Sequence, residues 1–517
     1  MMKTSIKNGD YLKSKQIIKI ILPIAILNFV IYLFTLYFTS YGIFRDEFYY
    51  LACANRPAFG YVDQPPLTIW ILAIWKFVFG DSLYAIRFIP AIVSSLTISV
   101  LGLFTIKLGG SKSAVIIAML TFMFTPIFMG MNTTYSMDVF DFFFWILSAF
   151  VFLQIVETSN KKLWYLLGII IGIGLLNKIS MFWLGAGLFA GTLFTPKRED
   201  LKTKYPYIAA GIALLVFSPY IIWNITHDFS HIEFMRNATQ GKYGGLTPVS
   251  FITSMFFIVN PLAMIIWIPG IIFYFFNKNT KIFRPLGYIW LVTFIILIIN
   301  WHSKATYLAP AFQILFAGGA VQLVSWNRIN DKLKYALVTV VIVFNLLLSP
   351  YARPLLPPQS FLQYQSAILF KVPNSEGHES VLPQHYADMF GWESLARDVS
   401  KVYQTLPDEE KKRTVVYCSN YGEAGAIEYF AKKYPLPKVI CPHNSYWYWW
   451  SDKIIDPTII IIGGTAEQHL DAVKECNLAA VHKTQYVMPY ENNLNIFIAR
   501  GLKMSLEKAR KIFKNFS

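Results

Sequence analysis

Two acidic groups near the start of the chain have positions that suggest chemistry. Asp46 and Glu47 follow directly on an apolar run that ends at Phe38, and Asp63 follows on the same loop, in Asp-Gln-Pro-Pro. Carboxylates at a membrane boundary are costly, so they are functional candidates by default. Such a pair can take a proton from an attacking hydroxyl, share a proton, or bind a divalent cation. We predict Asp46, Asp63 and Glu47 as catalytic residues, and Asp46 with Asp63 as a pair able to hold Mg²⁺, Mn²⁺ or Zn²⁺.

Each of these acids also has a structural explanation. Asp46-Glu47 is equally a solvated step at the start of a helix, and Asp63 before two prolines is equally a turn. Asp138, in Tyr-Ser-Met-Asp ahead of an apolar run, could cap a helix, bind substrate, or do both. The aromatic residues after Glu47, Tyr49 among them, favour an amphipathic helix that holds the carboxylates at its edge.

Further along the chain, His227-Asp228 precedes His231 and Glu233. The spacing is not that of a zinc motif and no Cys joins it, so a His-Asp pair that hydrogen-bonds a substrate is preferred. Cationic residues on nearby loops can neutralise a phosphate group, although a boundary lysine can also extend its amine to the membrane surface. The predicted substrate-binding residues are Asp138, His227, Lys304, Arg236, Lys242 and Tyr49.

The elements that must position these residues are membrane spans. Of the 517 residues 55% are hydrophobic and only 15% charged, whereas soluble proteins average about 25% charged. Apolar runs of the length that a span needs recur up to residue 351, and the shorter run 66–79 is expected to form an interfacial or re-entrant helix. We predict about eleven spans, at 17–39, 83–107, 113–131, 137–156, 162–177, 179–195, 205–223, 251–276, 285–300, 305–325 and 333–351.

Basic residues collect in alternate loops between these runs, which the positive-inside rule assigns to the cytoplasm together with the N-terminus. This distribution also explains the net charge of +16 without invoking nucleic acid. All the candidate residues then fall on the opposite, extracytoplasmic face, and such convergence is typical of one site. We expect a transmembrane domain over 1–352, with a first outer loop at 40–82.

The remainder, 353–517, holds more than half of the acidic residues and is predicted to be a soluble extracytoplasmic α/β domain. Short apolar runs at 413–418, 438–441 and 458–462 read as strands, and 424–433 and 466–475 read as helices. Cys418 and Cys441 each end a predicted strand, and they could form a disulfide or stay as two core thiols. The aromatic stretch 444–450 could stack on sugars or lie on the bilayer, but a core cluster is the simpler reading.

An ordered set of motifs resembles a known family. Arg45-Asp46-Glu47, Asp63-Gln64-Pro65-Pro66, Tyr135-Ser136-Met137-Asp138, His227-Asp228-Phe229 and Lys304-Ala305-Thr306-Tyr307 occur in the order found in GT-C glycosyltransferases of family 39. That family includes protein O-mannosyltransferases and lipid A aminoarabinose transferases. The resemblance covers roughly residues 10–350, and the tail is similar to that of uncharacterised bacterial members.

The resemblance implies a polytopic α-helical membrane enzyme of the GT-C type. Such an enzyme moves a sugar from a polyprenyl-phosphate donor to an extracytoplasmic glycan, lipid or protein hydroxyl, with inversion. It implies Asp46 as the base or acceptor-positioning acid, Asp63 as the second acid, and Lys304 and His227 near the donor phosphate. One departure is Asp63-Gln64 in place of the Glu-Lys of the aminoarabinose transferases, which removes a lysine that could face the lipid phosphate. The competing hypothesis is a transporter of polyprenyl-linked sugars, which would need charged groups near both leaflets.

Overall fold

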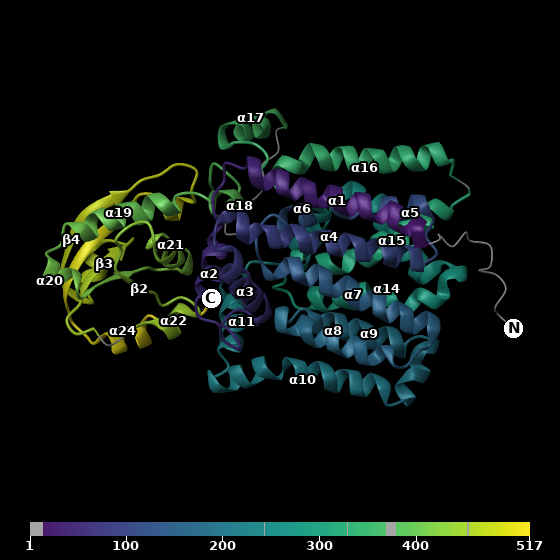
Figure 1. Ribbon diagram of the computed structural model, residues 1–517, viewed down its shortest axis with the longest axis horizontal. Coiled ribbons are helices and arrows are strands. Elements are labelled where there is room, and N and C mark those ends of the chain that lie inside the picture. The colour runs from purple at the N-terminus through teal and green to yellow at the C-terminus, as the bar shows by residue number, and fades with distance from the viewer. Residues whose placement is uncertain (1–13, 242, 328, 369–378, 452–453) are drawn as a thin grey trace. The chain divides into compact units, whose positions relative to one another are not determined.

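The computed structural model describes residues 14–241, 243–327, 329–368, 379–451 and 454–517. The chain forms two compact units (Figure 1). Unit 1 comprises Met1–Phe38, Arg87–Ile222 and Tyr243–Leu355, and unit 2 comprises Thr39–Ile86, Trp223–Lys242 and Leu356–Ser517. The last change from unit 1 to unit 2 falls between Leu355 and Leu356, and the predicted division of the chain into two domains stays a prediction. The predicted first outer loop, however, groups with the tail, because its contacts are made there.

Unit 1 is helical, and its long helices run alongside one another in Figure 1. The start of α4 and the end of α10 belong to unit 2. The helices are α1 (Ser14–Phe38), α4 (Leu83–Lys107), α5 (Lys112–Phe124), α6 (Pro126–Met131), α7 (Met137–Thr158), α8 (Leu163–Asn177), α9 (Met181–Leu193), α10 (Tyr205–Thr226), α12 (Pro248–Val259), α13 (Met264–Ile271), α14 (Arg284–Ile299), α15 (Ala309–Ser325) and α16 (Asp331–Ala352).

Within the described residues, seven helices are long and apolar enough to cross a membrane. An eighth span is counted if the pair Pro248–Val259 and Pro261–Phe276, bent by 83°, is taken as one. The multi-span membrane architecture is therefore confirmed. The other three predicted spans coincide with the shorter apolar helices α5, α8 and α9. Pro126 separates α5 from α6, since proline has no N–H for the helix, and the polar pair Asn177-Lys178 separates α8 from α9.

Unit 2 contains a mixed five-stranded sheet in the order β2-β1-β3-β5-β4. The neighbours β2, β1 and β3 are parallel, and β5 is antiparallel to both β3 and β4. The strands are β1 (Thr414–Tyr417), β2 (Lys438–Ile440), β3 (Thr458–Ile462), β4 (Val473–His482) and β5 (Leu494–Leu502). The helices are α2 (Arg45–Ala54), α3 (Leu67–Phe79), α11 (Ser230–Gln240), α17 (Pro358–Ile368), α18 (Gln384–Ala387), α19 (Trp392–Gln404), α20 (Asp408–Lys411), α21 (Tyr421–Phe430), α22 (Tyr446–Trp449), α23 (Ala466–Leu470) and α24 (Leu506–Ile512).

The alternation of strand residues explains the two-sided core of this sheet. Val415 and Ile459 pack on one face with Leu506 of α24, while the intervening Val416 and Ile460 are equally buried. The predicted α/β tail is thus confirmed. The helix expected over 466–475 is wrong in its second half, because the chain leaves α23 after Leu470 and enters β4 at Val473 to pair with β5.

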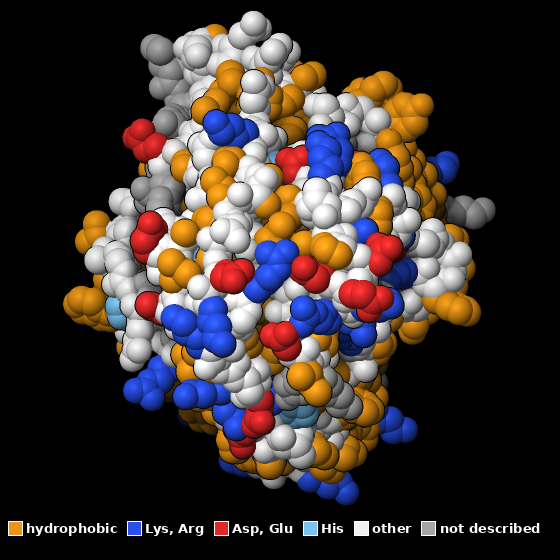
Figure 2. Space-filling model, turned by 90° about the vertical axis from the view of Figure 1, so that its left-hand side faces the viewer, with side chains coloured by type: hydrophobic (Ala, Val, Ile, Leu, Met, Phe, Trp, Pro, Cys, Tyr) orange, Lys and Arg blue, Asp and Glu red, His pale blue; other side chains and the backbone are white. Residues whose placement is uncertain are grey.

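The surface of unit 2 that Figure 2 presents mixes basic and acidic side chains. Many of them form local pairs on this unit, such as Lys411 with Asp408 and Lys412 with Glu409.

Candidate active site

The two first-loop carboxylates of unit 2 are each held by a tyrosine. The Tyr421 hydroxyl donates to Asp46 Oδ1 at 2.8 Å, and the Tyr49 hydroxyl donates to Asp63 Oδ1 at 2.8 Å. The two rings lie against each other, with centroids 4.9 Å apart. We call these four residues the tyrosine–carboxylate cluster. The structure thus brings the candidates Asp46, Asp63 and Tyr49 together and adds Tyr421 from the tail.

The local sequence explains why Asp46 has this position. Asp46 and Glu47 occupy the first turn of α2, where the helix dipole stabilises negative charge. Glu47 Oε2 accepts a hydrogen bond at 2.8 Å from the backbone N–H of Phe44, and the residue is buried. Its contacts are those of a helix cap, so a catalytic role for Glu47 stays a prediction. The Asp46 side chain, in contrast, is 42% exposed.

Glycine in α21 allows α2 to come close enough for the contact between Tyr421 and Asp46. A Cβ atom on Gly425 would lie 2.9 Å from the backbone carbon of Phe48, and one on Gly422 would lie 2.4 Å from Arg45 Cγ. These distances are shorter than real Cβ contacts, so a larger residue at either position would push the two helices apart.

Hydrogen bonds of Tyr49 and Val62, which lie next to Asp63, connect this acid's surroundings to the tail and to α11. Ser445 donates its backbone N–H to the Tyr49 hydroxyl at 3.2 Å, and its side-chain oxygen accepts from Val62 N at 3.1 Å. His231 Nδ1 lies 2.9 Å from Val62 O, so this nitrogen carries the proton and donates it. Burial lowers the pKa of His231, which therefore stays neutral.

Burial has the opposite effect on the carboxyl. Burial raises the pKa of Asp63 to about 6, and the charge of Asp46 also raises it. The hydrogen bond from Tyr49 acts in the opposite direction and lowers this pKa. The pKa of Tyr49 is raised well above its usual value by burial and by the Asp63 charge, so the phenol remains a donor. A carboxyl whose pKa is raised by burial beside a second acid is typical of a functional site.

The other candidates on unit 2 lie on or near α11. The His227 ring stacks on Trp223 with centroids 4.2 Å apart, and His227 Nδ1 is 2.8 Å from the Trp223 carbonyl oxygen. Arg236 is exposed on α11. Glu233 forms an ion pair with Lys514 at 2.6 Å. Lys242 lies outside the described residues.

Unit 1 contains a second polar cluster. Lys178 Nζ lies 2.5 Å from Asp138 Oδ1 and 3.9 Å from Asp141 Oδ2, and Ser180 donates to Asp141 Oδ1 at 2.6 Å. Ser136, and not Asp138, accepts the capping hydrogen bond at the start of α7. Sequence reasoning placed Lys178 at a turn and gave it no role. The signal that could have found it is a lysine between two apolar helices.

Lys304 also lies in unit 1, at the start of the segment that leads into α15. Its amine is 4.8 Å from the ring centroid of Tyr243, and the Tyr243 carbonyl oxygen lies 3.2 Å from His302 Nδ1. An aromatic ring attracts a lysine ammonium group, and phosphate binding by Lys304 stays a prediction.

The described residues include no group of three or more His, Cys, Asp or Glu side chains that could hold a metal ion. Mg²⁺ nevertheless often binds through one or two carboxylates and substrate phosphates, so Asp46 and Asp63 would suffice for a cation shared with a donor phosphate. The divalent cation stays a prediction. Cys418 and Cys441 are buried free thiols, the second of the two alternatives considered from the sequence.

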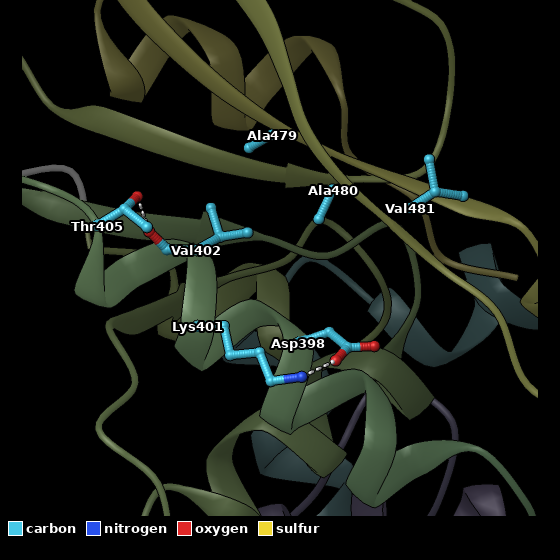
Figure 3. Close-up of a pocket in the computed structure, with 7 residues that line it drawn as sticks. All are labelled: Asp398, Lys401, Val402, Thr405, Ala479, Ala480 and Val481. Carbon is cyan, nitrogen blue, oxygen red and sulfur yellow. Dashed lines mark hydrogen bonds and ion pairs between the residues drawn. The ribbon is translucent and has the colours of Figure 1, made fainter.

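A separate pocket of about 300 Å³ lies between α19 and β4 (Figure 3). Asp398 and Lys401 form an ion pair there, and Thr405 lines the rest together with alanine and valine side chains. None of its lining residues belongs to the tyrosine–carboxylate cluster, so the pocket is not the candidate active site.

Sequence comparison finds similarity to glycosyltransferases over parts of the chain. The sequence profile of a family described as dolichyl-phosphate-mannose-protein mannosyltransferase matches residues 63–223. Undecaprenyl phosphate-alpha-4-amino-4-deoxy-L-arabinose arabinosyl transferase 2 of Pseudomonas fluorescens (strain Pf0-1) is 26% identical over 168 residues, which are 31% of this chain and 30% of that protein. Lipid A galacturonosyltransferase RgtD of Rhizobium johnstonii is 21% identical over 235 residues, 44% of this chain and 48% of that protein. The chain therefore matches less than half the length of each of these curated relatives.

The fold likeness extends over nearly the whole chain. The crystal structure of ArnT from Cupriavidus metallidurans bound to undecaprenyl phosphate aligns with a TM-score of 0.59 and 11% identity, covering 94% of this chain and 98% of that chain. The protein has the GT-C fold. Arabinofuranosyltransferase AftD from Mycobacteria gives a TM-score of 0.51 over 94% of this chain and 40% of its own. The resemblance to GT-C glycosyltransferases noted from the sequence is thus confirmed.

Proposed function

We propose that this GT-C protein is a membrane glycosyltransferase that moves a sugar from a polyprenyl-phosphate donor to an acceptor hydroxyl outside the cytoplasm. The observation that carries the proposal is the pairing of Asp46 and Asp63, two first-loop carboxylates that accept hydrogen bonds from adjacent tyrosines. The names of the matched relatives, which are transferases of arabinose and galacturonic acid groups, support the same class of reaction.

The proposed step is a single displacement. The acceptor oxygen attacks the anomeric carbon of the donor sugar, and the bond from that carbon to the phosphate oxygen breaks. Polyprenyl phosphate leaves with the bonding electrons, and the anomeric configuration inverts because attack and departure occur on opposite faces. The acceptor proton passes to the Asp46 carboxylate, which is the more exposed of the two acids. Asp63 is the second acid of the same loop, and its pKa is raised by burial and by the charge of Asp46.

Positive groups must offset the phosphate charge in this reaction. Lys304 and His227 are proposed for this role by resemblance, and Arg236 and Lys242 are further candidates. Lys178 is less suited, because its amine already contacts Asp138 and Asp141. We place the active site and the tail outside the cytoplasm of a bacterial cell, with the N-terminus inside, from the distribution of basic loops.

The decisive experiment is a transfer assay with purified protein and a panel of short-chain polyprenyl-phosphate sugars, read out as release of polyprenyl phosphate. We expect the wild type to turn over at least one donor and Asp46→Asn to lose at least about 100-fold in rate, as removal of a general base does. Asp81→Asn is the matched control, because Asp81 lies at the end of the same loop but pairs with Lys432. If no donor turns over while labelled lipid crosses vesicle membranes, the chain is a transporter instead.

A further inference from the structure

The tail of this protein contributes a side chain to the tyrosine–carboxylate cluster. Tyr421, the first residue of α21, donates its hydroxyl to Asp46 Oδ1 at 2.8 Å, and both residues belong to unit 2. We propose that Tyr421 is a positioning residue that fixes the orientation of the Asp46 carboxylate, so that the tail is an integral part of the catalytic centre. This inference rests on the proposed function.

The orientation of Tyr421 is determined by the helix cap before it. Asn420 Oδ1 accepts hydrogen bonds from the backbone N–H groups of Gly422 at 2.9 Å and Glu423 at 3.0 Å. Its amide nitrogen donates to Glu491 Oε1 at 3.1 Å, which fixes the cap in turn. These hydrogen bonds fix the first turn of α21 and, with it, the direction in which the Tyr421 side chain projects.

Neighbouring groups also fix the direction of the Tyr421 hydroxyl proton. Arg45 Nη2 lies 3.4 Å from the hydroxyl oxygen, and the guanidinium carbon is 5.4 Å from the ring centroid. The oxygen therefore faces a cationic donor, and its own proton points to Asp46. The pKa of Tyr421 is raised well above its usual value, first by burial and then by the charge of Asp46, so the phenol stays protonated.

This arrangement has a specific chemical consequence. With Oδ1 occupied by Tyr421, the carboxylate is held in one rotamer and presents its other oxygen, Oδ2, to the acceptor hydroxyl. Orientation of a base in this way contributes to the rate of the chemical step and not to the binding of the donor. The same arrangement is repeated at Asp63, where Tyr49 receives the backbone N–H of Ser445 and donates to the carboxylate. The tail thus supports both acids.

The test is Tyr421→Phe in the full-length purified protein, compared with Tyr434→Phe. Tyr434 is the matched control because its hydroxyl also donates to a carboxylate in the tail, Glu393 Oε1 at 2.9 Å, away from the first loop. We expect kcat of Y421F to fall about tenfold to a hundredfold, as loss of a hydrogen bond to a charged group does, with the donor KM within about twofold. Y434F should retain wild-type kcat. Equal kcat in Y421F and Y434F, or a loss confined to KM, overturns the inference.

A second measurement does not depend on turnover. Carbodiimide-catalysed labelling of carboxyl groups, followed by mass spectrometry, should show faster modification of Asp46 in Y421F than in the wild type. Asp408, which is 91% exposed, serves as the internal reference. Asn420→Ala, which loosens the cap without removing the hydroxyl, should shift labelling and kcat in the same direction by less. Unchanged Asp46 labelling in both variants refutes the contact. Absence of turnover in the wild type refutes only the proposed function.

Discussion

The buried carboxyl of Asp63 leads to a prediction about the pH dependence of transfer. Burial raises its pKa to about 6, and we propose that the reaction needs this second acid of the site as a carboxylate. Transfer should therefore rise with pH through about 6 in the wild type. The ionised form is stabilised by the Tyr49 hydroxyl, which donates to Asp63 Oδ1 at 2.8 Å.

Tyr49→Phe removes that donor and leaves the ring in place. A hydrogen bond to a charged group is worth about 1.5 to 3 kcal/mol, and one pKa unit corresponds to about 1.4 kcal/mol. The pKa of Asp63 should therefore rise by about one to two units in Y49F. The Asp63 pKa rises in Y49F because the Tyr49 hydrogen bond, while it is present, stabilises the carboxylate and keeps this pKa lower.

The measurement is kcat/KM for transfer across roughly pH 5 to 9, since this parameter reports the pKa values of groups in the free enzyme. We expect the acid limb to move from about pH 6 to about pH 7 to 8 in Y49F. Tyr61→Phe is the control: the Tyr61 hydroxyl, on the same loop, lies within hydrogen-bond distance of two backbone carbonyl oxygens, that of Cys53 at 3.2 Å and that of Arg56 at 3.1 Å. A limb in Y49F that stays at the wild-type position, or moves to lower pH, would refute the assignment of the limb to Asp63.

Three further predictions concern packing, protonation and metal. Gly425→Ala should lower the free energy of unfolding by about 1 to 3 kcal/mol and reduce transfer, because the added Cβ would meet the backbone of Phe48. The control is Gly211→Ala in α10, where the added Cβ has open space and should not destabilise the fold. Thermal unfolding and the transfer assay compare the two variants. Burial raises the pKa of Glu423 from 4.5 to about 7, so the folded state binds the Glu423 proton more tightly than the unfolded state, and the stability that this proton gives is lost as pH rises between these values. Glu423→Gln should therefore flatten the dependence of the unfolding temperature on pH. An equally steep dependence in the variant would contradict this. Removal of divalent cations with EDTA should reduce transfer and Mg²⁺ should restore it, while full activity in EDTA would rule the cation out.

Much of the architecture could be predicted from the sequence because hydropathy is a local property. An apolar run must be buried in lipid or protein whatever surrounds it, so the positions of the helices in unit 1 followed from composition, together with the short helix α3. Asp46 and Asp63 were recognised for the same reason, since a carboxylate beside a span is conspicuous in sequence. The three parallel strands of the tail also stood out as short apolar runs between turn residues.

Features that depend on pairing between distant segments could not be predicted. The second half of the expected helix at 466–475 became β4 because β5, contributed by the end of the chain, supplies its hydrogen-bond partners. Tyr421 lay outside the predicted helix 424–433, and Lys178 lay between two predicted spans, so neither stood out until the fold placed each beside its carboxylate. A side chain that is far away in sequence gains such a role only through tertiary contacts, because neither its own type nor its neighbours in the chain specify which group it will meet.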